Sequence, residues 1–179
     1  MCKKCESNPV YVFTNKRQVC KNCFIRWFQS KVLYTIKKFS MAKKGDVIGY
    51  KPGKSFRDVV LEDVLRYYER RAPVKVVKGT GKKFTKIAIS STTDLECNGI
   101  VNSLIKGKLS RENLPIKGKV IKPLYLFLDK EVLLYAKLRH LKFVKGKNSE
   151  DKLDRFIDSM EEKHPEVKRA VVNSYLKLT

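Results

Sequence analysis

Two Cys-x-x-Cys pairs stand within the first 23 residues and constrain the fold of this chain more than any other feature. They supply Cys2, Cys5, Cys20 and Cys23. Each pair can form a tight knuckle, and four thiolates brought together in this way suit tetrahedral coordination of one Zn²⁺. Because a closed set of four thiolates leaves no open coordination position, we expect a structural zinc ribbon and not a catalytic metal. An iron–sulfur cluster is the main alternative.

The segment between the two pairs is typical of a short hairpin. An apolar run at 9–13 is followed by a polar turn at 14–17 and then by Gln18-Val19, which indicates strand, turn and strand. Disulfides are not expected, because we place the protein in the cytoplasm. The fifth cysteine, Cys97, is isolated, and we expect it to be a small buried side chain rather than a nucleophile.

Strands and helices are expected to alternate after the ribbon. Apolar spacing predicts a basic aromatic helix at 24–39. Strands are predicted at 46–50, 73–77, 84–90 and 120–127, the last one bent or at an edge because of Pro123. Helices are predicted at 56–71 after a Ser55 cap, at 94–106, at 129–143 after an Asp129 cap, from Ser149, and from Pro165 onward.

This alternation indicates an α/β fold with an open, mostly parallel sheet, flanking helices and a C-terminal helical pair. We expect three parts. Residues 1–40 form the zinc ribbon with its helix, residues 41–147 form the α/β domain, and residues 148–179 form the C-terminal helices.

The chain is strongly basic, with 40 Lys and Arg against 18 Asp and Glu and a formal net charge of +22. The excess lies in residues 1–60 and 73–147, whereas residues 148–179 have a net charge of −1. Such a charge predicts a polyanionic partner, with nucleic acid first and an anionic membrane surface a distant second. No apolar run approaches the roughly 18 residues of a membrane span, so no membrane association is expected.

Two basic loops follow predicted strands, where ligands of parallel sheets bind. In the loop at 49–55, Gly53-Lys54-Ser55 resembles the end of a Walker loop, but the first required glycine would fall at Ile48. Pro52 also removes a backbone N–H from a loop that would work through such groups. Residual phosphate attraction by its lysines and a simple basic turn both stay open. The second basic loop is Gly-rich and covers 78–83.

Asp94 and Glu96 stand at the junction between a predicted strand and the helix after it. They could coordinate Mg²⁺ or cap the helix.

The order of these segments, from the cysteine ribbon through the basic aromatic helix to the acidic strand–helix junction, resembles that of the cytosolic tRNA 2-thiolation proteins of the PP-loop ATP-pyrophosphatase superfamily. The start, Cys-Lys-Lys-Cys through Val-Cys-Lys-Asn-Cys-Phe, is similar to the N-terminal zinc module of that family. Thr93-Asp94-Leu95-Glu96, followed by Leu-Ile-Lys-Gly at 104–107, resembles its acidic helix. Residues 121–143 and 156–178 resemble its next strand and helix and its closing helices. The resemblance implies a PP-loop fold, tRNA as partner and a cytoplasmic location.

The departures from the family pattern concern its chemistry, which is adenylation of a wobble uridine followed by sulfur transfer. The nucleotide loop Ser-Gly-Gly-x-Asp-Ser aligns with 51–56, where Gly53 is the only glycine kept. Leu95 replaces the second aspartate of the acidic motif. The basic loop at 78–83 replaces an expected Cys-x-x-Cys, and a further cysteine after the 129–143 helix is absent. A C-terminal zinc module is missing, and the chain looks far shorter than its relatives.

These departures favour a tRNA-binding, non-catalytic subunit of a wobble-uridine 2-thiolation complex. Its partner would be a catalytic PP-loop paralogue in a heterodimer, with a ubiquitin-like sulfur carrier acting through the complex. The expected tRNA phosphate contacts are Lys51, Lys54, Lys78, Lys82 and Lys83. The residual nucleotide-site candidates are Gly53, Ser55, Asp94 and Glu96.

Two other hypotheses stay open. One is an active adenylating or thiolating enzyme with an atypical nucleotide loop. The other is a stand-alone zinc-ribbon protein that binds nucleic acid.

Overall fold

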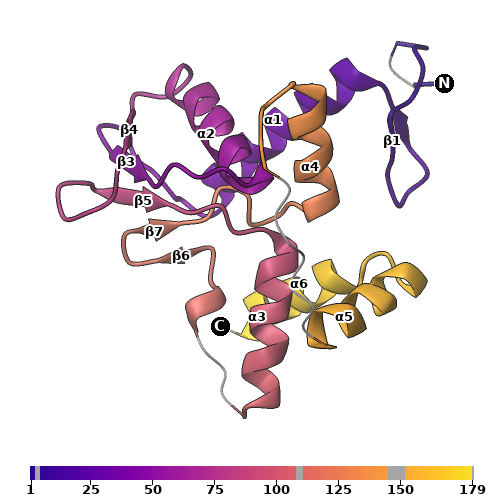
Figure 1. Ribbon diagram of the computed structural model, residues 1–179. Coiled ribbons are helices and arrows are strands. Elements are labelled where there is room, and N and C mark those ends of the chain that lie inside the picture. Colours follow the sequence, from indigo (N-terminus) through magenta and orange to yellow (C-terminus); the bar gives the residue numbers. More distant parts are fainter. Residues whose placement is uncertain (3–4, 108–110, 145–151, 179) are drawn as a thin grey trace.

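The computed structural model describes the chain except for residues 3–4, 108–110, 145–151 and 179. Its central sheet has five strands in the order β4-β3-β5-β7-β6 (Figure 1). The first four are parallel to one another, and β6 is antiparallel to β7 at one edge. The expected open, mostly parallel α/β sheet is confirmed. The strands are β3 (Val47–Tyr50), β4 (Lys75–Lys78), β5 (Lys86–Ala88), β6 (Ile116–Lys117) and β7 (Val120–Ile121).

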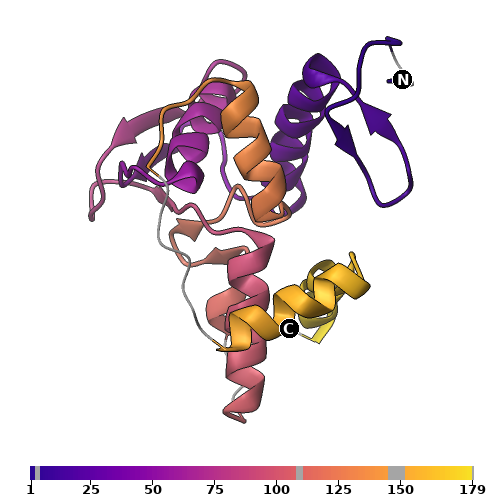
Figure 2. The ribbon, with the colours of Figure 1, turned by 45° about the vertical axis from the view of Figure 1, so that its right-hand side comes forward.

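The described helices form two groups, which Figure 2 shows one above the other. Helices α1, α2 and α4 contact one another, and α3 packs against α5 and α6. The first group consists of α1 (Lys21–Lys38), α2 (Phe56–Glu69) and α4 (Asp129–Leu138). The second consists of α3 (Thr93–Ile105), α5 (Lys152–Lys163) and α6 (Val167–Leu178), with the short 3₁₀ turn η1 (Arg111–Asn113) beside α3. None of the described helices combines the length and apolar character needed to cross a bilayer.

The N-terminal segment is the expected hairpin. Strand β1 (Tyr11–Val12) pairs antiparallel with β2 (Gln18–Val19), and α1 starts directly after Cys20. Aromatic side chains join the hairpin to this helix, since the ring centroids of Phe13 and Trp27 are 4.7 Å apart. Edge-to-face aromatic contacts of this kind add to the free energy gained by burying the rings.

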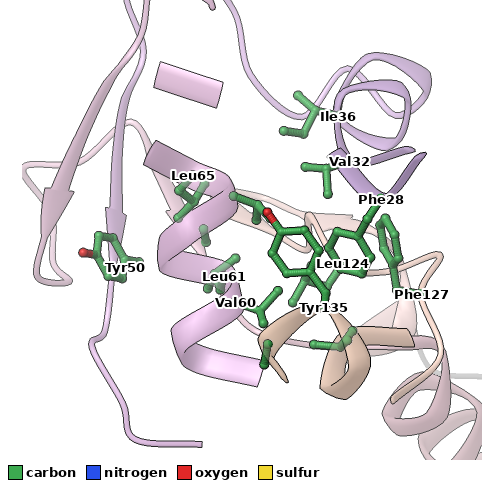
Figure 3. Close-up of a cluster of buried hydrophobic side chains, with 14 of the residues drawn as sticks. Phe28, Val32, Ile36, Tyr50, Val60, Leu61, Leu65, Leu124, Phe127 and Tyr135 are labelled. Atoms are coloured by element: carbon green, nitrogen blue, oxygen red, sulfur yellow. The ribbon is translucent and has the colours of Figure 1, made fainter. Parts of the chain in front are cut away.

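Apolar side chains from α1, α2 and α4 form the main core around the sheet (Figure 3). Phe28 of α1 stacks on Tyr135 of α4 at 4.1 Å, and both are fully buried. Burial of one such ring contributes roughly 1.5–3 kcal/mol. The labelled members are Phe28, Val32, Ile36, Tyr50, Val60, Leu61, Leu65, Leu124, Phe127 and Tyr135.

A second apolar cluster holds the lower group of helices together. Cys97 of α3 is only 1% exposed there, which confirms the expected small buried side chain. The other buried members are Ile100, Tyr125, Ile157, Val172 and Tyr175.

Two predicted elements were wrong in their limits. The strand predicted at 120–127 ends at Ile121, because Pro123 cannot donate to a ladder and the chain turns through Tyr125 and Phe127. Helix α4 ends at Leu138 and not near 143, and its N-cap is Leu128 instead of Asp129. The helix start expected at Ser149 lies outside the described residues.

Candidate metal centre and candidate nucleotide loop

The four cysteines of the two pairs lie together at the base of the hairpin. Their Sγ atoms are all within 4.8 Å of one another. The Sγ of Cys5 is 3.2 Å from that of Cys20 and 3.7 Å from that of Cys23. A tetrahedral ion with Zn–S bonds of about 2.3 Å requires S–S separations of about 3.8 Å, so the donor set fits one such ion.

Local backbone hydrogen bonds shape both knuckles. In the first, the N–H of Glu6 donates to the carbonyl of Cys2 at 2.9 Å, and Glu6 adopts a left-handed φ of 56°. In the second, the N–H of Phe24 donates to the carbonyl of Cys20 at 2.8 Å in the first turn of α1. The cysteines at the start of each knuckle, Cys2 and Cys20, are buried.

The first basic loop and the start of the second lie at the same edge of the sheet. Tyr50 at the end of β3 is in register with Lys78 on one side and Ala88 on the other. Because these strands are parallel, the segments that follow them leave the sheet together at its carboxyl edge. The five lysines predicted to contact phosphate are all exposed: Lys51, Lys54, Lys78, Lys82 and Lys83. Lys51, Lys54 and Lys78 lie at or just beyond this edge.

The second loop crosses to the opposite edge before β5. There the N–H of Thr85 donates to the carbonyl of Val47, and the Nζ of Lys119 donates to the carbonyl of Lys82 at 3.5 Å. Lys82 and Lys83 therefore do not share the expected edge.

A cleft of about 300 Å³ lies between the first loop and the end of β5. Lys51 and Gly53 line one side and Ser90 lines the other, with Asp58 of α2 also at its wall. Asp94 and Glu96 do not line it. The structure therefore brings Gly53 and Ser55 close to this cleft but not the two acidic candidates.

The carboxylate of Asp58 occupies the N-terminus of α2. Ser55 caps this helix, and its hydroxyl donates to Asp58 Oδ2 at 2.7 Å while accepting from the Asp58 N–H. Ser90 donates to Asp58 Oδ1 at 2.5 Å. A Cβ on Gly53 would lie 2.1 Å from Asp58 Oδ2, so the carboxylate lies directly against the loop backbone.

This position is the one where the helix dipole and free N–H groups would otherwise favour a phosphate. Sequence reasoning missed Asp58. The signal was available, because Ser55-x-x-Asp58 is a capping-box pattern.

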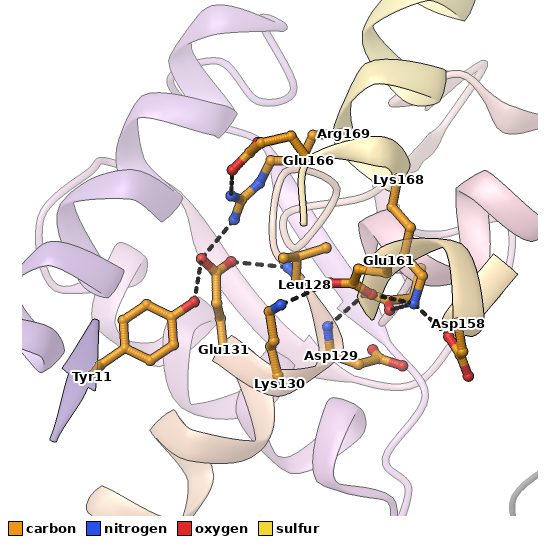
Figure 4. A network of polar contacts seen from close by, with 11 residues as sticks. Tyr11, Leu128, Asp129, Lys130, Glu131, Asp158, Glu161, Glu166, Lys168 and Arg169 are labelled. Atoms are coloured by element: carbon orange, nitrogen blue, oxygen red, sulfur yellow. Dashed lines mark hydrogen bonds and ion pairs between the residues drawn. The ribbon is translucent and has the colours of Figure 1, made fainter. Parts of the chain in front are cut away.

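Asp94 is paired with a lysine from the last helix. The Nζ of Lys168 is 2.6 Å from Asp94, and 2.7 Å from both Asp158 and Glu161 (Figure 4). Lys168 is only 4% exposed. The ammonium of Lys168 therefore occupies the centre of a cluster of three carboxylates. The spacing of these carboxylates alone would suit a metal ion.

The pKa values around Lys168 follow from burial and pairing. Burial alone would lower the pKa of Lys168, but its hydrogen bonds to Asp158, Asp94 and Glu161 hold it well above the usual range. Burial raises the pKa of Asp94, and the nearby charge of Asp129 raises it further. Asp94 does not cap its own helix, whose N-cap is Thr92.

Glu96 is paired in the same manner. It is 3% exposed, and Lys122 forms an ion pair with it at 2.8 Å. Ser91 also donates a hydrogen bond to it. Both acidic candidates are thus neutralised by lysines of the same chain.

A polar network continues from this region to the hairpin (Figure 4). Glu131 of α4 is fully buried and accepts hydrogen bonds from Arg169 of α6 at 2.7 Å and from the Leu128 N–H at 2.9 Å. It also accepts from the hydroxyl of Tyr11 at 3.4 Å. Glu131 therefore links the hairpin, α4 and α6.

Comparison with known proteins finds a similarity in structure and none in sequence. No protein-family model matches it, and no curated protein matches it in sequence. Among solved structures, it is similar to that of the U34-tRNA thiolase NcsA from Methanococcus maripaludis with its [4Fe-4S] cluster. The match has a TM-score of 0.81 and 18% identity, and it covers 99% of this chain and 86% of the thiolase chain.

This coverage corrects one expectation, since the chain is not far shorter than this relative. The four-cysteine cluster, the mostly parallel sheet and the C-terminal helices all have the order that the sequence motifs implied. The chain therefore has the same fold as this U34-tRNA thiolase.

Proposed function

We propose that this chain is a tRNA-binding subunit of a wobble-uridine 2-thiolation complex and does not itself activate the uridine with ATP. Its partner is a catalytic PP-loop paralogue, bound as a heterodimer. The observation that carries this proposal is the Asp58 carboxylate, which lies against the loop aligned with the family's nucleotide loop, in a chain with a thiolase fold. A carboxylate there repels a triphosphate and competes for the groups that would bind it.

The acidic motif supports the same conclusion. A Mg²⁺ ion bound by Asp94 would have to displace the ammonium of Lys168, and one bound by Glu96 would have to displace Lys122. Removing a buried partner from such a pair is costly, because the remaining charge stays desolvated.

Sulfur handling would also fall to the partner. Outside the four-cysteine cluster the chain has only Cys97. Burial raises the pKa of its thiol to about 11, so the thiol stays protonated and a poor nucleophile at neutral pH. A ubiquitin-like sulfur carrier would deliver sulfur to the catalytic subunit of the complex.

The role assigned to this chain is to hold tRNA through its phosphates. Among the described residues, Lys51, Lys54, Lys82 and Lys83 form no ion pair, and only Lys78 is paired, with Glu62 at 3.1 Å. Lys51, Lys54 and Lys78 flank one sheet edge, which suits contact with a phosphate backbone. A cytoplasmic location follows from this role.

For the cysteine cluster we propose a structural Zn²⁺. The sulfur separations suit a single tetrahedral ion, and both knuckles come from one short hairpin. Elemental analysis of the purified protein is expected to give one zinc per chain, and an iron content with sulfide would contradict this assignment.

Co-purification tests the complex. Tagged full-length protein is expected to retain a longer PP-loop protein with an intact Ser-Gly-Gly-x-Asp-Ser loop, together with tRNA at low salt. Deletion of the gene is expected to remove wobble-uridine 2-thiolation. Recovery of neither partner would contradict the proposal, and normal thiolation in the deletion strain would favour a stand-alone zinc-ribbon protein.

A further inference from the structure

A pocket of about 420 Å³ lies between the hairpin and α1, beside the cysteine cluster. Two arginines, an indole and a hydroxyl line it next to two of the thiols. These residues are Arg17, Arg26, Trp27, Ser30, Cys5 and Cys23. The pocket lies far from the loops at the carboxyl edge of the sheet, and nothing in the proposed function uses it.

Neither arginine has a carboxylate partner among the residues that the structure describes. The guanidinium carbon of Arg17 lies 4.5 Å from the centroid of the Phe13 ring, and its Nε is buried without a hydrogen-bond partner. Arg26 is exposed. Neither forms an ion pair with a described residue, and the sequence has no Asp or Glu between residues 7 and 45.

This arrangement leaves two planar cationic groups free to bind an anion. Guanidinium groups bind phosphate through paired N–H donors, and a cation–π contact such as that with Phe13 holds one of them in place.

Trp27 gives the pocket an apolar wall. Its indole is partly buried against Phe13 and Phe24, with ring centroids 4.7 and 5.3 Å away. Single-stranded nucleic acids bind where cationic side chains contact the phosphates and aromatic side chains contact the bases. The pocket offers both at the scale of one nucleotide.

We propose that this pocket binds a single unpaired nucleotide of an RNA strand, with its phosphate on Arg17 and Arg26 and its base against Trp27. The inference rests on the proposed function for the identity of the RNA, which is tRNA. It gives the hairpin a binding role in addition to its fold, at a site separate from the lysines of the sheet edge.

A structural role for the arginines is the competing explanation. Four thiolates and one Zn²⁺ carry a net charge of −2 together. Two nearby guanidinium groups would lower the electrostatic cost of placing this charge in the protein. In that case the arginines would affect metal retention and not RNA.

Tryptophan fluorescence can distinguish these roles, because Trp27 is the only tryptophan of the chain. The full-length metal-loaded protein is titrated with a uridine pentanucleotide, with UMP, with ATP and with an unmodified tRNA transcript. We expect saturable quenching by the pentanucleotide and by tRNA, and much weaker binding of UMP and ATP, because a strand adds neighbouring phosphates.

The variants are R26Q, R26K and R17Q, with K163Q as a control that removes one exposed charge on α5. R26Q and R17Q are expected to weaken pentanucleotide binding about tenfold or more. R26K should recover part of the loss, and K163Q should change binding less than about threefold. Zinc content, measured on every variant, is expected to stay at the wild-type value.

Unchanged pentanucleotide affinity in both glutamine variants would overturn the inference, as would loss of zinc in step with loss of binding. Binding of ATP or UMP as tight as that of the pentanucleotide would also overturn it. If tRNA binds with no change in Trp27 fluorescence, the pocket proposal fails and the proposed function stands. If tRNA does not bind at all, the proposed function fails first.

Discussion

Lys168 shows at the scale of one residue how this chain differs from a metal-dependent site. Three carboxylates surround its ammonium at 2.6–2.7 Å. We expect K168M to lower the free energy of unfolding at pH 7 by about 2–4 kcal/mol, because it leaves buried carboxylates facing one another. The lower limit allows for Asp158, which is 67% exposed and screened by solvent. Urea unfolding measures the difference.

The deficit of K168M should depend on pH. Without the lysine, repulsion among Asp94, Asp158 and Glu161 raises carboxyl pKa values in the folded state above their unfolded values. Such a group stabilises the folded protein as the pH falls through the folded pKa. The difference from wild type should therefore shrink between pH 7 and pH 5. K163M, which removes an exposed lysine of α5, should show no such trend, and a constant deficit in K168M would contradict the explanation.

Single residues also show which contacts could not be predicted from the sequence. Asp94 and Glu96 stood out as acidic residues at a strand–helix junction. Their partners did not, because Lys168 lies 74 residues from Asp94 and is brought to it only by the packing of α6 on α3. Lys122, the partner of Glu96, falls within the strand predicted at 120–127. Long-range pairing of this kind leaves no local pattern.

At the scale of elements, the N-terminus of α2 carries the proposed exclusion of a nucleotide. D58N keeps most hydrogen bonds of the cap but removes its charge. We expect a loss of about 0.5–1 kcal/mol in unfolding free energy, since the charge no longer faces the helix dipole. We also expect weak binding of inorganic pyrophosphate to appear, measured by calorimetry. Equal pyrophosphate affinity in wild type and D58N would show that the carboxylate does not exclude phosphate.

The hairpin with its proposed Zn²⁺ forms a second element, and we expect its stability to be separate from that of the sheet. Chelation of the metal is expected to loosen β1 and β2, because the two knuckles lose their common ligand and only a few hairpin side chains, Tyr11, Phe13 and Val19, pack on the core. Trp27 should then become more exposed, while hydrogen exchange of β3, β4 and β5 stays slow. C5S should reproduce the effect and lose the metal, whereas C97A should keep it. Retention of the folded hairpin after complete chelation would refute a structural role for the ion.

Element prediction succeeded where the pattern was local. The strand expected at 46–50 appears at Val47–Tyr50, and Ser55 caps α2 as expected. It failed for residues 122–127, whose apolar character suits a strand but whose side chains fill the core from turns. Tyr125 and Phe127 are both fully buried. The apolar pattern at 122–127 therefore reflects burial of the side chains and not an extended backbone.

At the scale of the whole molecule, the charge of +22 should control tRNA affinity. K51Q/K54Q is expected to reduce the salt dependence of tRNA binding, with the slope of log K against log salt falling by about 1 per lysine in contact. K152Q/K163Q is the matched control on α5, where the C-terminal segment has little net charge. Filter binding between about 50 and 200 mM salt gives both slopes. Identical slopes would place the tRNA elsewhere.

The central claim is that this molecule keeps a thiolase fold without using ATP. Calorimetric titration of the full-length, metal-loaded protein with ATP and Mg²⁺ tests it most directly, with tRNA binding measured on the same preparation to show that the protein is intact. We predict no binding heat at millimolar ATP while tRNA still binds. Saturable ATP binding in the micromolar range, abolished by a large residue at Gly53, would contradict the account and favour the hypothesis of an active adenylating enzyme.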